Sequence, residues 1–218
     1  KGAYASSGTC FSGNAARLAA ENLREKILFH GAQMLGEPVA DVQLATPGVV
    51  RGKKGEVSFG DIAHKGETGT GFGSLVGTGS YITPDFAFPY GANFAEVAVN
   101  TRTGEIRLDK FYALLDCGTP VNPELALGQI YGATLRAIGH SMSKEIIYDA
   151  EGHPLTRDLR SYGAPKIGDI PRDFRAVLVP SDDKVGPFGA KSISEIGVNG
   201  AAPAIATAIH DACGIWLR

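Results

Sequence analysis

Apolar residues recur at helical spacing in three long segments of the chain. The middle segment is the best marked, because Asn122 is a good N-cap, Pro123 suits a first helical position and Glu124 complements the helix dipole. The last segment ends at Gly214, where a glycine is typical of a helix stop. The pattern therefore predicts three main helices, over about residues 14–35, 123–144 and 199–214.

Short apolar runs bounded by turn residues predict strands between these helices. The clearest hairpin joins residues 93–100 to 106–115 through the turn at 101–105. Further strands are expected at 42–45, 49–51, 57–59, 146–148 and 176–180. Because hairpins and helices mix without regular strand–helix alternation, we predict an α+β fold. We expect two compact subdomains that share an interface, over residues 1–80 and 81–218.

The 29 glycines are roughly twice the usual number, and two groups of them are informative. Residues 66–80 hold six of them, and we expect a flexible lid or a disordered loop there. Gly128, Gly132 and Gly139 lie on or near one stripe of the middle helix. Each costs about 1 kcal/mol relative to alanine in a helix interior, so the stripe indicates close approach by another backbone or a ligand.

Charge and cysteine usage exclude several classes of protein. The formal net charge is −2 over 218 residues, with 44% hydrophobic and 20% charged residues, so no basic excess favours a nucleic acid or an anionic membrane as partner. No apolar run approaches the roughly 20 residues that a spanning helix needs. The three cysteines, Cys10, Cys117 and Cys213, are scattered, which is typical of a reducing cytoplasm. Neither they nor the five histidines form a metal-binding pattern.

Residues 5–13 form the first candidate site, because small residues, hydroxyls and glycines precede a predicted helix. Such a segment exposes backbone N–H groups beside the positive end of a helix dipole, where an anion can bind. Gly8 and Gly13 even match the glycine spacing of a P-loop, but Asn14 and Ala15 replace its Lys and Ser/Thr. Nucleotide hydrolysis is therefore unsupported. The alternative interpretation is a simple capping loop.

Glu195 is the second candidate, an isolated carboxylate among the apolar residues Ile193, Ile196 and Val198. Partial burial would raise the pKa of such a carboxyl toward the range useful for a general base. The alternative is a surface or helix-capping glutamate. Asp116, at the end of a predicted strand, has an ordinary loop position, and we assign it no role.

Several short motifs follow one another in the order seen in a known family. They are Tyr4-Ala5-Ser6-Ser7, Phe94-Ala95-Glu96-Val97, Asp116-Cys117-Gly118, Asn122-Pro123, Leu127-Gly128-Gln129-Ile130-Tyr131-Gly132-Ala133, Tyr162-Gly163-Ala164-Pro165, Gly189-Ala190-Lys191 and Glu195. Together they resemble the C-terminal part of the molybdenum-binding subunit of the xanthine dehydrogenase and aldehyde oxidase family, with the bacterial xanthine dehydrogenases nearest. We therefore expect this chain to be the later portion of a larger subunit.

The resemblance implies a molybdenum–molybdopterin cofactor and a general base. Glu195 matches the family's base, and the protein is expected to give the metal no side-chain ligand. The segment matching the cofactor contacts comprises Tyr4, Ala5, Ser6, Ser7, Gly8, Thr9 and, separately, Gln129. The family usually has glycines before the glutamate and prolines after it; here Ser192 and Ser194, then Ile196-Gly197, replace them.

The resemblance also implies a substrate and partners. We expect hydroxylation of a purine, xanthine or hypoxanthine, with water as the oxygen source. Iron–sulfur clusters and FAD are expected on other domains or subunits, together with the rest of the molybdenum subunit, in the cytoplasm. An aldehyde or another N-heterocycle is the alternative substrate. A non-catalytic structural or phosphate-binding module is the alternative from a different class.

Overall fold

The computed structural model describes residues 7–68, 71–83 and 85–217, which fall into two compact units with separate cores. Of the described residues, 11–68 and 71–83 form the smaller unit, and 7–10 and 85–217 form the larger one. Helices and small open sheets are mixed in the α+β manner predicted. No helix in the described part of the chain is long and apolar enough to cross a membrane.

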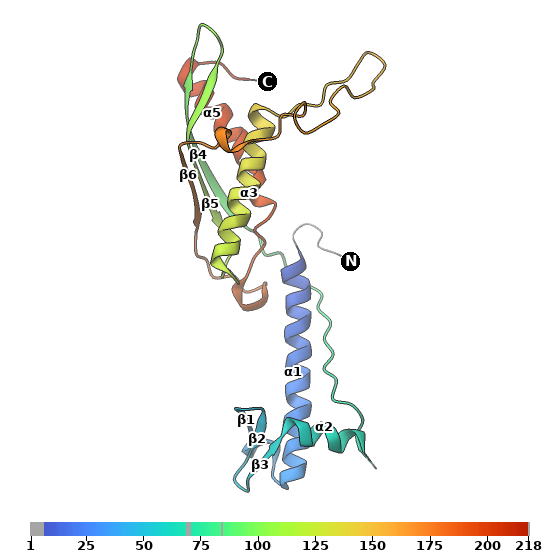
Figure 1. Cartoon of the computed structure of the whole chain (residues 1–218). Helices are drawn as coiled ribbons and strands as arrows, with labels where there is room; N and C mark the ends of the chain where they lie inside the picture. Colours follow the sequence, from blue (N-terminus) through green and yellow to red (C-terminus); the bar gives the residue numbers. More distant parts are fainter. Residues whose placement is uncertain (1–6, 69–70, 84, 218) are drawn as a thin grey trace. The chain divides into compact units, whose positions relative to one another are not determined.

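In the smaller unit, a three-stranded sheet and a short helix pack against the C-terminal half of the long first helix (Figure 1). Strands β1 (Gln43–Ala45), β2 (Val49–Arg51) and β3 (Glu56–Ser58) are antiparallel in that order, between helices α1 (Gly8–Leu35) and α2 (Phe59–Glu67). A 3-10 turn at Val39–Asp41 precedes the sheet. The core comprises Ile27, Leu28, Ala32, Val42, Val50 and Ile62.

Two expectations for the first 80 residues are wrong. Helix α1 begins at Gly8, so the P-loop-like glycine spacing lies inside a helix rather than in a loop. Residues 71–80 pack along α1 instead of forming a free lid: a Cβ at Gly77 would lie 2.3 Å from the Ala19 carbonyl oxygen, and Lys26 Nζ donates to the Val76 carbonyl at 2.8 Å. These glycines let an extended segment approach the helix backbone.

Helix α2 was not predicted, although Ser58 accepts from the Asp61 N–H as an N-cap.

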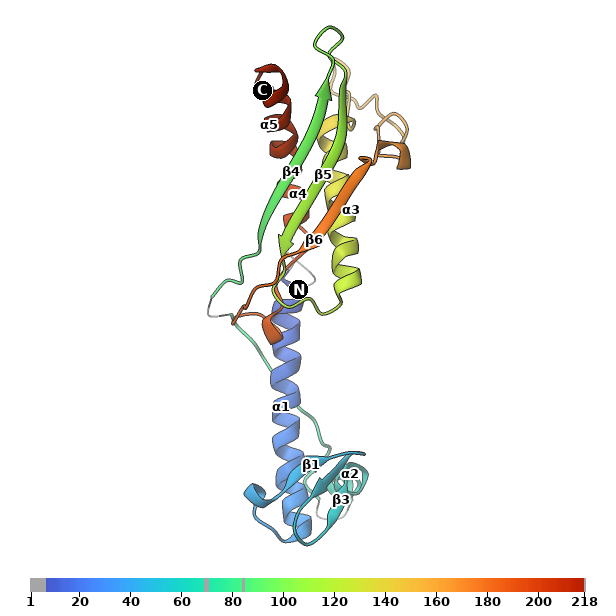
Figure 2. The same cartoon turned by 90° about the vertical axis from the view of Figure 1, so that its left-hand side faces the viewer.

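The larger unit is built on a sheet of three long strands (Figure 2). Strand β5 (Ile106–Asp116) is central, antiparallel to β4 (Tyr90–Val99) and parallel to β6 (Asp173–Leu178). A register shift in β4 at Glu96/Val97 bends the hairpin. The hairpin predicted at 93–100 and 106–115 is confirmed.

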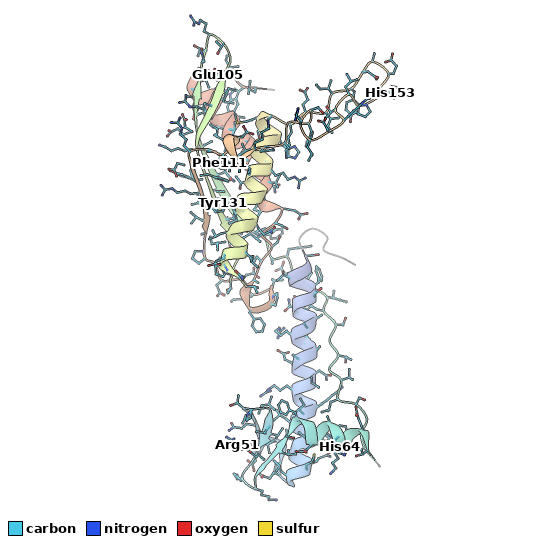
Figure 3. All side chains as sticks on the ribbon, in the orientation of Figure 1. Arg51, His64, Glu105, Phe111, Tyr131 and His153 are labelled. Atoms are coloured by element: carbon cyan, nitrogen blue, oxygen red, sulfur yellow. The ribbon has the colours of Figure 1, made fainter. Side chains whose placement is uncertain are left out.

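Helices α3 (Pro123–Met142), α4 (Ile196–Asn199) and α5 (Ala201–Cys213) cover one face of this sheet (Figures 1 and 2). Figure 3 shows Phe111 on the sheet and Tyr131 on α3; both rings make edge contacts with Phe174, at centroid distances of 6.3 and 5.0 Å. Asn122 caps α3 by accepting from the Leu125 N–H at 3.0 Å, as predicted. The core gathers Leu108, Phe111, Ala113, Leu115, Ile130, Ala137, Ile138, Ala201, Ile205 and Ile209.

Residues 143–172 leave the end of α3 as an irregular excursion that carries His153 (Figure 3). The hairpin expected near 146–148 is reduced to a single bridge between Tyr148 and Pro154. Two 3-10 turns, Ile167–Asp169 and Pro187–Gly189, flank β6. The second turn begins the segment that leads to Glu195.

Candidate functional site

Two of the residues singled out from the sequence, Gln129 and Glu195, line one cavity of about 310 Å³. Gln129 comes from the first half of α3, and Glu195 directly precedes α4. The remaining lining residues are Gly128, Gly132, Ala133, Arg136, Ser194 and Val198. The fold therefore joins a carboxylate, an amide and a glycine-bearing helix face that lie far apart in the sequence.

The glycines of α3 have two different environments. A Cβ built at Gly139 would lie 2.4 Å from Pro165 Cγ, so packing within the chain requires glycine there. A Cβ built at Gly128 or at Gly132 would meet no atom of the described chain within 4 Å, apart from its chain neighbours and the local helix backbone. Since these two glycines line the Glu195 cavity, they leave helix backbone open to a group that enters it.

A second cavity, of about 270 Å³, adjoins the first through Gln129, which lines both. Its wall is mainly apolar, with Leu125, Ile193 and Cys117, and it includes Thr9 from the start of α1. Burial, reinforced by the charge of Asp116, raises the pKa of the Cys117 thiol, so this cysteine is a neutral lining group at physiological pH. The fold thus brings Thr9 and Gln129 together.

The remaining predicted contacts lie at the start of the chain. Ser7 directly precedes α1 and Gly8 is its first residue, so the anion-binding interpretation moves from a loop to the first turn of this helix. Tyr4, Ala5 and Ser6 lie outside the residues that the structure describes.

Glu195 is exposed, so of the two alternatives that the sequence left open for its position, partial burial and the surface, the structure shows the surface. Its backbone carbonyl accepts from the Val198 N–H at 3.0 Å in the turn that begins α4. Ile193 and Ile196 pack against the larger core, but the carboxylate itself lies in the wall of the open cavity. The apolar neighbours therefore hold the backbone of Glu195 without covering its side chain.

Asp116 was assigned no role from the sequence, yet it forms a buried ion pair with Lys191 at 2.5 Å. Its other carboxylate oxygen accepts from Ser181 Oγ at 2.5 Å and from the Gly118 N–H at 2.8 Å. Burial opposes ionisation of Asp116, but the hydrogen bonds from Lys191, Ser181 and Gly118 outweigh it and hold the pKa of this carboxyl below its ordinary value. Asp116 is therefore ionised and fully hydrogen-bonded at neutral pH.

Backbone pairing joins the same two segments. The Lys191 N–H donates to the Cys117 carbonyl at 2.7 Å, and the Thr119 N–H donates to the Gly189 carbonyl at 2.8 Å. The sequence signal for this attachment was faint. It consists of one aspartate ending an apolar strand and one lysine in a segment with little other charge. Neither residue identifies the other, because 75 positions separate them.

Across the described ranges, no group of three or more His, Cys, Asp or Glu side chains is placed to hold a metal ion. The polar groups that line the two cavities are two amides, hydroxyls, a thiol, a guanidinium, an ammonium and a carboxylate. These groups suit hydrogen bonding to an organic ligand and transfer of a proton.

Comparison with known proteins points to one family. Residues 1–171 match the family described as the molybdopterin cofactor-binding domain. The 6-hydroxypseudooxynicotine dehydrogenase complex subunit gamma of Paenarthrobacter nicotinovorans is 30% identical over 97% of this chain and 27% of its own length. One subunit of the probable xanthine dehydrogenase of Bacillus subtilis is 29% identical over 74% of this chain and 22% of its own.

The fold is shared with solved structures. The reconstituted CO dehydrogenase from Oligotropha carboxidovorans superimposes with a TM-score of 0.81 at 26% identity, over 97% of this chain and 27% of that one. The chain thus spans about a quarter of the length of these relatives.

Proposed function

Because this chain belongs to the molybdopterin cofactor-binding domain family, we propose that its two adjoining cavities hold the molybdenum cofactor and that Glu195 acts there as a general base. The observation that carries the proposal is the cavity shared by Glu195, Gln129 and two glycines at which an added Cβ would meet nothing within 4 Å outside its own helix backbone. The same cavity lies in a chain whose family and fold are those of molybdenum hydroxylases.

The residues present fit a flat, polar-edged cofactor. Gly128 and Gly132 leave room where a Cβ would stand, so a ring system can approach the backbone of α3. The Gln129 amide both donates and accepts, as the edge of a pterin requires. Thr9, with Ser7 and Gly8 at the start of α1, offers a hydroxyl and backbone N–H groups suited to a phosphate.

When bound, the molybdenum–pterin cofactor supplies the redox and oxygen-transfer chemistry. The chain's own contribution is orientation and proton transfer. Glu195 accepts, on a carboxylate oxygen, the proton that water loses when its oxygen is transferred to the substrate. Gln129 orients the cofactor edge, and the apolar wall of Leu125 and Ile193 limits the access of water to it.

We propose a purine, xanthine or hypoxanthine, as substrate; the likeness to the probable xanthine dehydrogenase of Bacillus subtilis supports this choice. A second candidate is the substrate class of the 6-hydroxypseudooxynicotine dehydrogenase complex, favoured by that relative's match over 97% of the chain. Since that relative belongs to a complex, we also propose partner subunits that carry iron–sulfur clusters and FAD. The free cysteines Cys10, Cys117 and Cys213 favour a cytoplasmic location.

Glu195→Gln in the full-length subunit tests the base. The amide keeps the shape of the side chain but cannot take the proton, so turnover should fall by a factor on the order of 100 or more while molybdenum content is retained. Glu96→Gln, on an exposed strand position, is the matched control and should leave both unchanged. Activity retained in Glu195→Gln would remove the assignment.

A substrate panel on the same full-length enzyme tests the substrate class. Xanthine and hypoxanthine should be turned over with the highest kcat/KM, ahead of 6-hydroxypseudooxynicotine and of simple aldehydes. A preference for one of the latter would overturn the purine proposal and leave the role of Glu195 standing. Metal analysis that finds no molybdenum after molybdate-replete expression would instead favour a non-catalytic module.

A further inference from the structure

The backbone of Glu195 is held on both sides by contacts that the general-base role does not use. After it, Gly197 is buried against α3: a Cβ there would lie 2.7 Å from Ala133 Cβ, and Thr134 Oγ1 donates to the Gly197 carbonyl at 3.3 Å. Before it, Lys191 ends the stretch paired with residues 117–119. The segment carrying the carboxylate is therefore short and attached at both ends.

The Lys191–Asp116 ion pair, which attaches the segment before Glu195, is almost completely buried. The side chains of Lys191 and Asp116 are 5% and 11% exposed, the least exposed of the ion pairs in the described part of the chain. Lys191 Nζ donates to Asp116 at 2.5 Å and to the Phe88 carbonyl at 3.2 Å, and it lies 5.4 Å from the centre of the Tyr90 ring. The ammonium thus has directional partners on β5 and on the residues at the start of β4.

Such a pair is a costly way to obtain stability. The desolvation of two charges offsets much of their attraction, and replacing both partners by neutral groups of similar volume is often neutral or stabilising. What an apolar pair lacks is direction, because hydrogen bonds specify where the lysine backbone lies and a dispersion contact does not. The polar pair therefore suits a place where the position of the following residues matters.

We propose that Asp116 and Lys191 form a positioning pair for Glu195, setting where the carboxylate lies relative to Gln129 and the open face of α3. This rests on the proposed function only for the role of Glu195 as base; the attachment itself is independent of that role. Neither residue touches the reacting atoms. Both act through the segment between Lys191 and Gly197.

The test compares Lys191→Met with Asp116→Asn/Lys191→Met in the full-length enzyme. The single variant leaves a buried carboxylate without its counter-charge, so both the thermal midpoint and kcat should fall. The double variant removes both charges while the introduced amide oxygen still accepts from Gly118 and Ser181, so the midpoint should recover toward wild type. Because direction is still lost, kcat should stay about 10–100-fold low with KM little changed. Recovery of kcat together with the midpoint would show a merely structural pair and overturn the proposal.

Hydrogen exchange supplies a readout that does not need activity. In the double variant the amides of Lys191 and Thr119 should exchange faster than in wild type even though the midpoint recovers. Unchanged exchange there would overturn the proposal. Lys110→Met, which breaks the exposed pair with Glu96 on the sheet, is the matched control and should alter neither kcat nor exchange at residues 186–199.

The two hypotheses fail in different ways. If Glu195→Gln keeps full activity, the base assignment fails whatever the exchange data show. If Glu195→Gln loses activity while the double variant keeps wild-type kcat and exchange, only the positioning pair fails.

Discussion

Gly139 and the pair Gly128 and Gly132 lie on one helix but in different surroundings. At Gly139 the neighbouring Pro165 occupies the space a side chain would need. At Gly128 and Gly132 nothing in the described chain does, and the cavity of Glu195 lies there instead. The α3 backbone at Gly139, the closed half, is thus covered by its own chain, whereas the backbone at Gly128 and Gly132, the open half, is not.

The different surroundings of these glycines indicate two different reasons why a helix keeps glycine at an interior position. A helix-interior glycine costs about 1 kcal/mol relative to alanine. At Gly139, close packing offsets that cost within the folded chain. At Gly128 and Gly132 the described chain shows no such offset, which agrees with the binding that we propose for the open backbone. Sequence spacing alone placed all three on one stripe and did not separate them.

The largest effect is expected at the buried ion pair of Asp116 and Lys191. Asp116→Asn leaves the Lys191 charge buried without its partner, so the free energy of unfolding at pH 7 should fall by about 3 kcal/mol or more. The pKa of Asp116 is lowered in the folded state, so its stabilisation is complete above the ordinary carboxyl range, near pH 4, and is lost as the pH falls through the folded value.

Urea unfolding at several pH values between about 7 and 3 measures this dependence. The gap between wild type and Asp116→Asn should be largest at neutral pH and should narrow in acid as wild-type Asp116 takes up its proton. A gap that stays constant or widens in acid would contradict the ionised pair.

The next effect tests the closed half directly. Gly139→Leu forces a side chain against Pro165 and should lower the free energy of unfolding by about 2 kcal/mol. Gly128→Leu, in the open half, is the matched control and should cost little because nothing stands within 4 Å of the new Cβ. Equal losses in the two variants, measured by chemical denaturation, would erase the distinction between the halves.

The smallest effect has the opposite sign. Gly128→Ala improves helix propensity at an open position, so the free energy of unfolding of the cofactor-free protein, measured by urea denaturation, should rise by about 0.5–1 kcal/mol. A loss of stability there would mean that an internal contact requires this glycine.

Capping and turn residues correctly predicted the elements whose ends depend only on neighbouring residues in the sequence. The Asn122 cap and Pro123 fixed the start of α3, and the 101–105 turn fixed the β4–β5 hairpin. The pairing of Gln129 with Glu195 rested on the family resemblance, because no periodicity links the two residues. Only the structure distinguishes Gly128 and Gly132, where an added Cβ has space, from Gly139, where it does not.

The errors share a physical cause, which is contact between segments distant in sequence. Gly77 and Gly79 resembled a flexible loop because the sequence does not reveal the helix against which they pack. Asp116 resembled an ordinary strand end because its partner Lys191 lies far along the chain. For Glu195 the sequence left burial and exposure open; its apolar neighbours pack against the core, and Glu195 itself is exposed.

Cofactor content in a Gly132→Leu variant of the full-length subunit tests the central claim most directly. The leucine should fill the open face of α3, so molybdenum and pterin content should fall at least about tenfold while the unfolding midpoint of the cofactor-free protein stays at or above that of wild type. Full molybdenum and pterin content in this variant would contradict a cofactor lying against the open half of α3.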